Sequence, residues 1–206
     1  FTKSVYSTNF ETAARTFDSA TNGTATYGIR GVDIATSATL GSFIEKQWLM
    51  NGGAQNLATW WSQSLEFMTI ATVAAAPTTG DSFFGMGDVT TAVGGITYTP
   101  RQMGFKIVYA ASAATLSATN ADGTTETATD ITTGNTVTAP IHYHVVKNGT
   151  TNIRFYTDIT LAATHTTNLP TSSTNITFMG EFSVSNKNTA TDFGIQFAAA
   201  TVAYPY

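Results

Sequence analysis

The chain has 206 residues, no cysteine and a formal net charge of −4. The lack of cysteine excludes disulfides and thiolate metal sites, and an acidic chain without clusters of Lys and Arg is a poor partner for nucleic acid. No apolar run approaches the roughly 20 residues that a membrane-spanning helix needs, so we expect no membrane partner.

Threonine is unusually frequent, with 41 residues, whereas only 11% of all residues are charged. Because threonine is β-branched, it suits pleated strands and can hydrogen-bond on an exposed face without carrying charge. A surface with so few charges is unusual for an enzyme. It favours a repetitive assembly, in which neighbouring molecules cover part of each surface.

Turn signals such as Asn-Gly and Asp-Gly divide the chain into short segments. Most segments between them alternate between apolar and polar residues or are short and apolar, which is typical of strands. Helical periodicity is limited to one or two turns within 54–62. The predicted strands cover 3–9, 27–34, 42–50, 65–74, 82–88, 101–110, 113–120, 124–131, 140–147, 152–158, 176–184 and 193–202.

The strongest local pattern is the segment 141–158, which predicts a β-hairpin. Its two strands alternate, with Ile141, Tyr143 and Val145 on one face of the first strand. Asn148-Gly149 between them predicts a type I′ turn, because both central residues of that turn need positive φ.

Strands of this length and spacing predict two packed antiparallel sheets in an all-β sandwich. We expect a single domain over residues 18–206, because no linker separates two cores. Residues 1–17 precede it as an N-terminal segment. We expect this segment to act as a strand, or as an anchor that pairs with the sheet edge of a neighbouring molecule.

Several segments, in order, resemble the concanavalin A-like (laminin-G-like) jelly-roll sandwich, particularly the versions found in bacteriophage virion proteins. They include a strand with a Glu between apolar residues, an "aromatic-Gly-apolar-Gly-acid" strand and a late aromatic hairpin. In this chain Asp158 is followed by Ile159 instead of the glycine usual in the family. The segments are Leu65–Ile70, Asp81–Asp88, Met103–Ile107, Ile141–Val146, Ile153–Asp158 and Phe193–Val202.

The resemblance implies a jelly-roll fold and a non-enzymatic structural protein of a virus particle, either a capsid decoration protein or a tail-fibre domain. It would then be exposed on the virion surface. Its partners would be further copies of itself, or a major capsid or tail protein.

Carboxylates give no indication of catalysis. Hydrolases on this fold carry acids that alternate along one strand, but no predicted strand here has two acids spaced i, i+2. Glu66 is a lone strand acid, and we expect it to make a structural hydrogen bond or to face solvent. The sequence therefore predicts no glycoside hydrolase and no catalytic residues.

His142 and His144 project from the same face of a predicted strand, as paired metal ligands can. The alternative is a polar outer face opposite the apolar residues of that strand, and it is favoured because no third ligand is evident; His165 lies in a Thr-rich segment. Asp122 and Asp130 offer isolated oxygens and not a calcium loop. We expect no metal and no cofactor.

Trp48, Trp60 and Trp61 are candidate aromatics for a ligand or an interface. They would suit stacking on sugar rings, but large aromatics more often pack under a loop or at a subunit contact. Two alternatives to the virion structural role remain open. One is a carbohydrate-binding adhesion module that recognises host-surface glycans, and the other is a cellular surface or filament protein.

Overall fold

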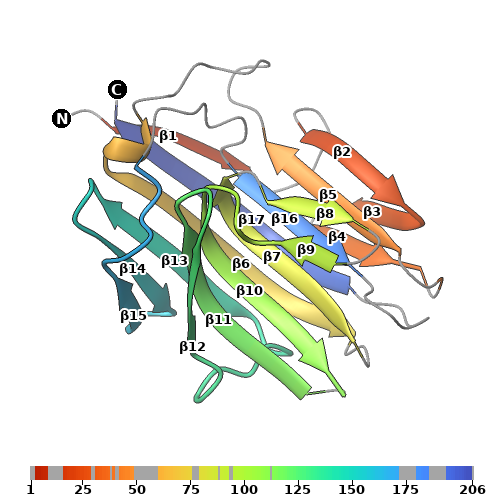
Figure 1. Cartoon of the computed structure of the whole chain (residues 1–206). Helices are drawn as coiled ribbons and strands as arrows, with labels where there is room; N and C mark the ends of the chain where they lie inside the picture. The colour runs from red at the N-terminus through yellow and green to blue at the C-terminus, as the bar shows by residue number, and fades with distance from the viewer. Residues whose placement is uncertain are drawn as a thin grey trace.

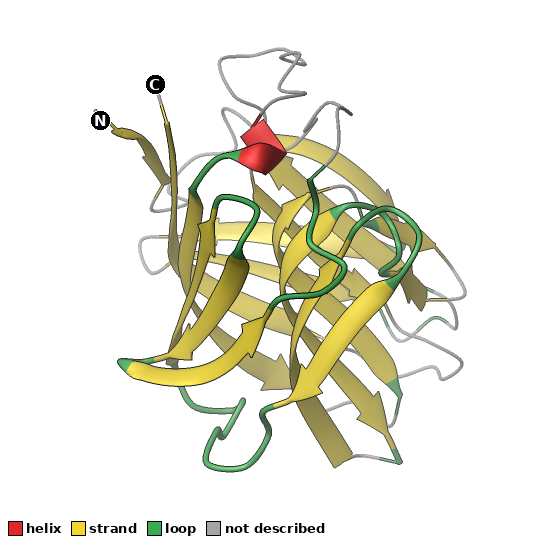
Figure 2. Ribbon diagram, turned by 60° about the vertical axis from the view of Figure 1, so that its left-hand side comes forward, coloured by secondary structure: helices red, strands yellow, loops and turns green. Residues whose placement is uncertain are grey.

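Two antiparallel β-sheets pack face to face in the computed structural model of the chain (Figure 1). Figure 2 shows the two layers of strands from the side, with the short helix Trp60–Ser62 at one end. The structure describes residues 3–8, 16–28, 31–37, 39, 42–48, 60–75, 79–87, 89–92, 95–111, 113–171, 180–185 and 194–205.

The first sheet, called sheet A below, has eight strands in the order β15-β14-β13-β6-β17-β4-β3. The eighth, β1, pairs with the C-terminal part of β17, on the side where β4 pairs with its N-terminal part. The bounds are β1 (Lys3–Thr8), β3 (Gly23–Gly28), β4 (Gly31–Thr36), β6 (Leu65–Ala75), β13 (Ile141–Asn148), β14 (Asn152–Thr157), β15 (Thr160–His165) and β17 (Gly194–Pro205).

The second sheet, sheet B, has seven strands in the order β12-β11-β10-β7-β16-β5-β2. A separate two-stranded hairpin is formed by β8 and β9, and the short helix η2 is a 3₁₀ turn. The bounds are β2 (Thr16–Thr21), β5 (Phe43–Trp48), β7 (Gly80–Gly87), β8 (Thr90–Ala92), β9 (Gly95–Thr97), β10 (Gln102–Ala110), β11 (Ala113–Ala121), β12 (Glu126–Asp130), β16 (Gly180–Ser185) and η2 (Trp60–Ser62).

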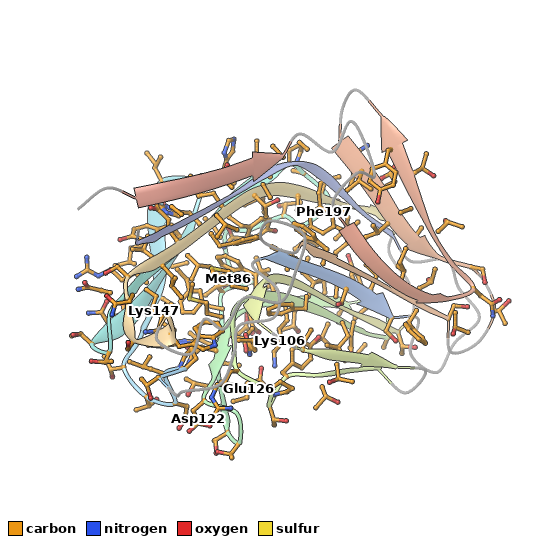
Figure 3. The ribbon with its side chains drawn as sticks, turned by 90° about the horizontal axis from the view of Figure 1, so that it is seen from above. Met86, Lys106, Asp122, Glu126, Lys147 and Phe197 are labelled. Carbon is orange, nitrogen blue, oxygen red and sulfur yellow. The ribbon has the colours of Figure 1, made fainter. Side chains whose placement is uncertain are left out.

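Aromatic side chains from both sheets fill the space between them. Phe84 of sheet B has its ring centroid 4.7 Å from that of Tyr143 in sheet A, and Phe182 of sheet B lies 4.0 Å from Phe197 of sheet A. Figure 3 shows Met86 and Phe197 among these inward side chains. Such rings bury large apolar areas and gain further from tilted and edge-to-face contacts, so they hold the two sheets together.

The predicted all-β sandwich is confirmed, and most predicted strands lie within a residue or two of the observed ones. The strand predicted over 27–34 is wrong, because β3 and β4 form a hairpin there, with Gly28 opposite Gly31. Gly31 has a φ of 125°, which glycine adopts far more readily than other residues. The sequence also missed β2, β8, β9 and β15.

The predicted hairpin over 141–158 is confirmed, with its predicted inward residues buried. The type I′ turn is wrong. Asn148 pairs with Asn152, the Thr151 N–H donates to the Asn148 carbonyl at 3.1 Å, and only Gly149 in this turn has positive φ. A three-residue connection therefore replaces the two-residue one.

The N-terminal segment contributes β1 to sheet A of its own molecule (Figure 1). The anchoring role of residues 1–17 and the domain division at residue 18 stay predictions. Among the described residues, no helix is long and apolar enough to cross a membrane.

Candidate functional site

The outer face of sheet A carries a row of side chains that crosses five strands. Along β13, alternation turns the odd-numbered residues from Ile141 into the core, so His142 and His144 face outward, as the sequence predicts. His144 pairs with Tyr156 on one side and with Met68 on the other. The complete row, from β15 to β17, is Leu161, Tyr156, His144, Met68 and Thr201.

A hollow of about 250 Å³ opens on this face, at the junction of β13, β6 and β17. It forms because β17 presents short side chains there, with Ala199 opposite the longer Ile70 of β6. β17 is also irregular at this point, and the Thr69 hydroxyl donates to the Ala199 carbonyl at 2.6 Å, which holds the irregular backbone in place. The lining residues are Met68, Thr69, Ile70, His142, Tyr143, His144, Asp158, Ala199, Ala200 and Thr201.

Two contacts fix the ring of His144 at the hollow. Its Nε2 lies 2.7 Å from Glu66 Oε1, and the ring of Tyr156 is stacked on it with centroids 5.5 Å apart. The expectation that Glu66 makes a structural hydrogen bond is confirmed. Held in this way, the imidazole has a defined orientation before any ligand arrives.

Asp158 is held in a similar way by the backbone of β13. The His142 N–H donates to Asp158 Oδ1 at 3.1 Å, and the Asp158 N–H donates to the His142 carbonyl at 2.7 Å. Asp158 sits in the turn between β14 and β15 with a φ of 53°. Burial, with the Asp158 charge as a second cause, raises the pKa of Tyr143, so this phenol stays protonated in the core.

Part of the outer face of sheet B is covered by other residues of the chain. The β8–β9 hairpin and the residues after it lie over β7, so that Phe83 is fully buried although it points away from the main core. Phe83 packs in a small separate cluster with Val89, Ile96 and Tyr98. Burial raises the pKa of Tyr98 well above its ordinary value, with the Asp81 and Glu126 carboxylates as further causes.

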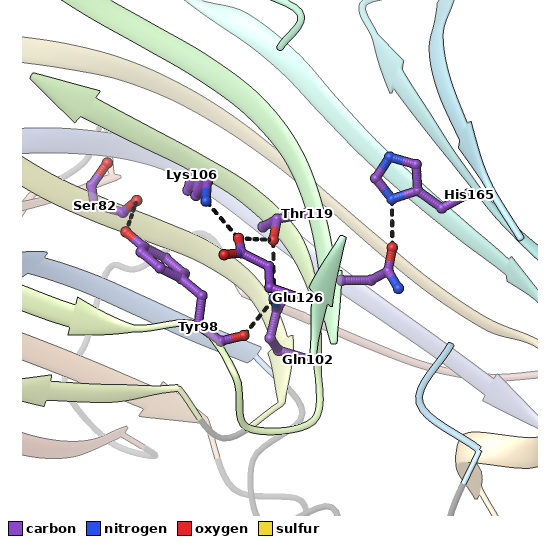
Figure 4. A network of polar contacts seen from close by, with 8 residues as sticks. Ser82, Tyr98, Gln102, Lys106, Thr119, Glu126 and His165 are labelled. Atoms are coloured by element: carbon purple, nitrogen blue, oxygen red, sulfur yellow. Dashed lines mark hydrogen bonds and ion pairs between the residues drawn. The ribbon is translucent and has the colours of Figure 1, made fainter. Parts of the chain in front are cut away.

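Polar side chains beside this hairpin bond to one another (Figure 4). Lys106 Nζ lies 2.5 Å from Glu126 Oε1 and 4.7 Å from the centre of the Tyr98 ring, and the Thr119 hydroxyl donates to the same Glu126 oxygen at 2.6 Å. The Gln102 amide donates to Thr119 and to the Tyr98 carbonyl. The Lys106 ammonium and the Glu126 carboxylate therefore already have partners within this network.

The three histidines are not brought together. His165 of β15 points inward and is buried, with Nδ1 2.5 Å from Asn120 Oδ1 and Nε2 2.8 Å from the Thr129 hydroxyl (Figure 4 labels His165). Burial lowers the pKa of His165. His142 and His144 lie on the opposite side of sheet A, and among the described residues no group of three His, Asp or Glu side chains is placed to hold a metal.

Trp61, one of the candidate aromatics, is 0% exposed and belongs to the main core, so its ring is closed to a ligand in this structure. The side chains of Trp48 and Trp60 lie outside the described residues. A sugar platform that uses these two stays a prediction.

Sequence analysis missed Met68, Ile70, Tyr156 and Asp158 as members of a site. The alternation of Glu66, Met68 and Ile70 along one strand matches that of His142 and His144 along another. These two sets of residues lie side by side only because β6 pairs with β13. A single sequence does not show which strands pair or in which register.

No protein-family model and no curated protein matches this chain. Solved structures do match. Arcelin-5, a lectin-like defence protein of Phaseolus vulgaris, has 9% identity and a TM-score of 0.63, with 100% of both chains covered. The fold is a lectin-like β-sandwich.

Two phage proteins share this fold. The CBM2 module of the evolved Dit of Lactobacillus casei BL23 phage J-1 has 13% identity and a TM-score of 0.62, covering 99% of this chain and 97% of the module. A conserved carbohydrate esterase of the Shiga toxin-encoding bacteriophage phi24B has 14% identity and a TM-score of 0.59, covering 97% of each chain. At these identities the likeness shows the fold alone.

Proposed function

We propose that this chain is a non-catalytic carbohydrate-binding module on the surface of a phage virion, and that it binds sugar at the hollow on the outer face of sheet A. The observation that carries the proposal is the preorganised row around His144. The His144 ring, Asp158 and Thr201 line the hollow there together with apolar side chains.

Sugars suit this arrangement because they combine apolar ring faces with many hydroxyl groups. The stacked His144 and Tyr156 rings provide a planar surface, and carboxylates accept hydrogen bonds from hydroxyl groups. Sites of this kind are concave and largely apolar, with a few polar groups placed for orientation. Their rigidity reduces the entropy lost on binding.

A catalytic role is less well supported. None of the residues that line the hollow is a serine or a cysteine, and Glu66 is already engaged by His144. Two carboxylates facing one cleft would be needed for glycoside hydrolysis. We therefore propose binding without turnover, although a structural neighbour is a carbohydrate esterase.

A structural role on the particle, as a capsid decoration or tail-fibre domain, is supported by a second observation. At the free edge of sheet A, the β14–β15 hairpin exposes two large apolar side chains, Ile159 at 98% and Leu161 at 52%. Exposed apolar residues at a sheet edge favour contact with another protein or another copy. Light scattering of Ile159→Lys beside the unchanged chain tests self-association, which we expect the substitution to weaken; an unaltered oligomer would contradict it.

The glycan proposal is tested by a glycan array followed by calorimetry on the sugars that bind. We expect His144→Ala and Tyr156→Ala to weaken binding at least about ten-fold, since aromatic and charge-assisted contacts contribute roughly 1–3 kcal/mol. Lys106→Ala, on the outer face of sheet B, is the matched control and should bind normally. Equal losses in all three variants, or no binding to any sugar on the array, would contradict the proposal.

A further inference from the structure

The lining of the hollow is divided between two kinds of chemistry. Met68, Ile70 and Ala199 form an apolar side; Met68 is 38% exposed, one of the few large apolar side chains open to solvent among the described residues. The polar lining includes His142, His144, Asp158 and Thr201. A ligand that fills the hollow must match both sides.

The size of the hollow limits what enters it. A volume of about 250 Å³ corresponds to roughly eight water molecules at about 30 Å³ each. That is room for one sugar ring with a substituent inside the hollow, and further rings of a longer glycan would lie outside it. Selectivity at the hollow therefore depends on the substituents of a single sugar.

We propose, on the basis of the function proposed above, that the hollow selects a sugar whose substituent ends in a methyl group over the same sugar with a hydroxyl there. An acetamido group and the methyl of a 6-deoxy sugar share this chemistry. A hydroxyl placed against Met68, Ile70 and Ala199 would lose its water without gaining a hydrogen-bond partner, whereas a methyl group gains from burial.

The polar lining distinguishes an acetamido sugar from a 6-deoxy sugar. Asp158 Oδ1 already accepts the His142 N–H, and no hydrogen bond within the described part of the chain engages its second oxygen. An acetamido N–H can donate to this oxygen, whereas a 6-deoxy methyl carries no donor. The acetamido sugar therefore makes one more hydrogen bond than the 6-deoxy sugar.

Matched sugar pairs test the proposal on the whole chain. N-acetylglucosamine and glucose differ by an acetamido group against a hydroxyl, and L-fucose and L-galactose differ by a methyl against a hydroxymethyl group. We expect at least one pair to show a preference of about ten-fold for the methyl-bearing member by calorimetry or NMR titration, the range for a small apolar group in a pocket.

Two variants locate the preference. Met68→Gln replaces apolar surface with polar surface of similar size, and Ile70→Thr introduces a smaller polar side chain; both positions lie outside the core, and each substitution should reduce the preference to nearly one. Circular dichroism checks that both variants stay folded.

Three results would overturn the proposal, and they are distinguishable. Binding of both members of each pair with equal affinity would overturn the methyl preference and leave glycan binding intact. A preference for the methyl-bearing sugar that is unchanged in both variants would show that the selective site is not this hollow. Failure to bind any of the four sugars or any other glycan would overturn the proposed function as well.

Discussion

The two outer faces of the sandwich come from the same alternation of inward and outward residues, yet they differ in what their polar groups do. On sheet B, the Lys106–Glu126 pair and its neighbours bond to one another beneath and beside the β8–β9 hairpin. On sheet A, the His144–Glu66 pair stands beside an open hollow.

This difference shows that the alternation of inward and outward residues along a strand does not by itself determine whether a face binds a ligand. Both faces have a cation-forming side chain, a glutamate and an aromatic ring in contact. Among the described residues, the outer face of sheet A combines them with short residues, at Ala199, and with an exposed methionine. Steric access therefore separates a candidate binding face from a structural one.

The largest expected effect comes from the cover on sheet B. Phe83→Ala empties the cluster beneath the β8–β9 hairpin, and we expect it to lower the free energy of unfolding by about 3 kcal/mol. Met68→Ala on the open face of sheet A should change it by less than about 0.5 kcal/mol. Urea denaturation measures both values. Similar losses of unfolding free energy for the two substitutions would contradict the distinction between a covered and an open face.

A second prediction contrasts the two sides of β13. His144 on the outer side has a carboxylate partner, whereas Lys147 on the inner side is fully buried and donates to the Gly149 carbonyl (Figure 3 labels Lys147). Burial lowers the pKa of Lys147 from 10.5 to about 8. The unfolded chain therefore binds more protons between these two values, so the contribution of Lys147 to stability rises with pH across that window.

Lys147→Met removes the buried charge and keeps the length of the side chain. We expect it to raise the free energy of unfolding by about 1 kcal/mol at pH 7, with the gain shrinking toward pH 10. Thermal melts of both proteins across this range provide the measurement. A gain that is independent of pH would show that Lys147 has the same pKa in the folded and the unfolded chain.

The smallest expected effects compare the two glutamates. Glu126→Gln breaks the pair with Lys106 and should cost about 1 kcal/mol of stability without changing sugar affinity. Glu66→Gln should change stability by less than about 0.5 kcal/mol and weaken sugar binding, because a neutral amide holds the His144 ring less strongly than the carboxylate does. Equal effects of both substitutions on affinity would remove the distinction between the faces.

Much of the fold follows from the sequence because its strong strands alternate clearly, as in the hairpin that contains Tyr143 and Phe155. The missed strands lack this signal. β15 contains Thr, Ala and a single Leu, so its strand structure depends on pairing with β14 rather than on its own pattern. The Asn148-Gly149 turn shows the same limit, since the favoured dipeptide adopted a longer connection.

Only part of the candidate site could be predicted from the sequence. The outward direction of His142 and His144 follows from alternation within one strand. Their proximity to Met68 and Ile70 depends on which strands pair, and the hollow depends on an irregularity in β17 near Ala199. Neither long-range pairing nor a local irregularity has a signature in a single sequence.

The central claim is that the outer face of sheet A binds the ligand. Backbone amide chemical shifts, recorded by NMR during titration with a sugar that binds, test it most directly. We predict the largest shifts in β6, β13 and β17, centred on Met68, His144 and Thr201. Shifts confined to β7, β10 and the β8–β9 hairpin would place the binding face on sheet B and contradict the account.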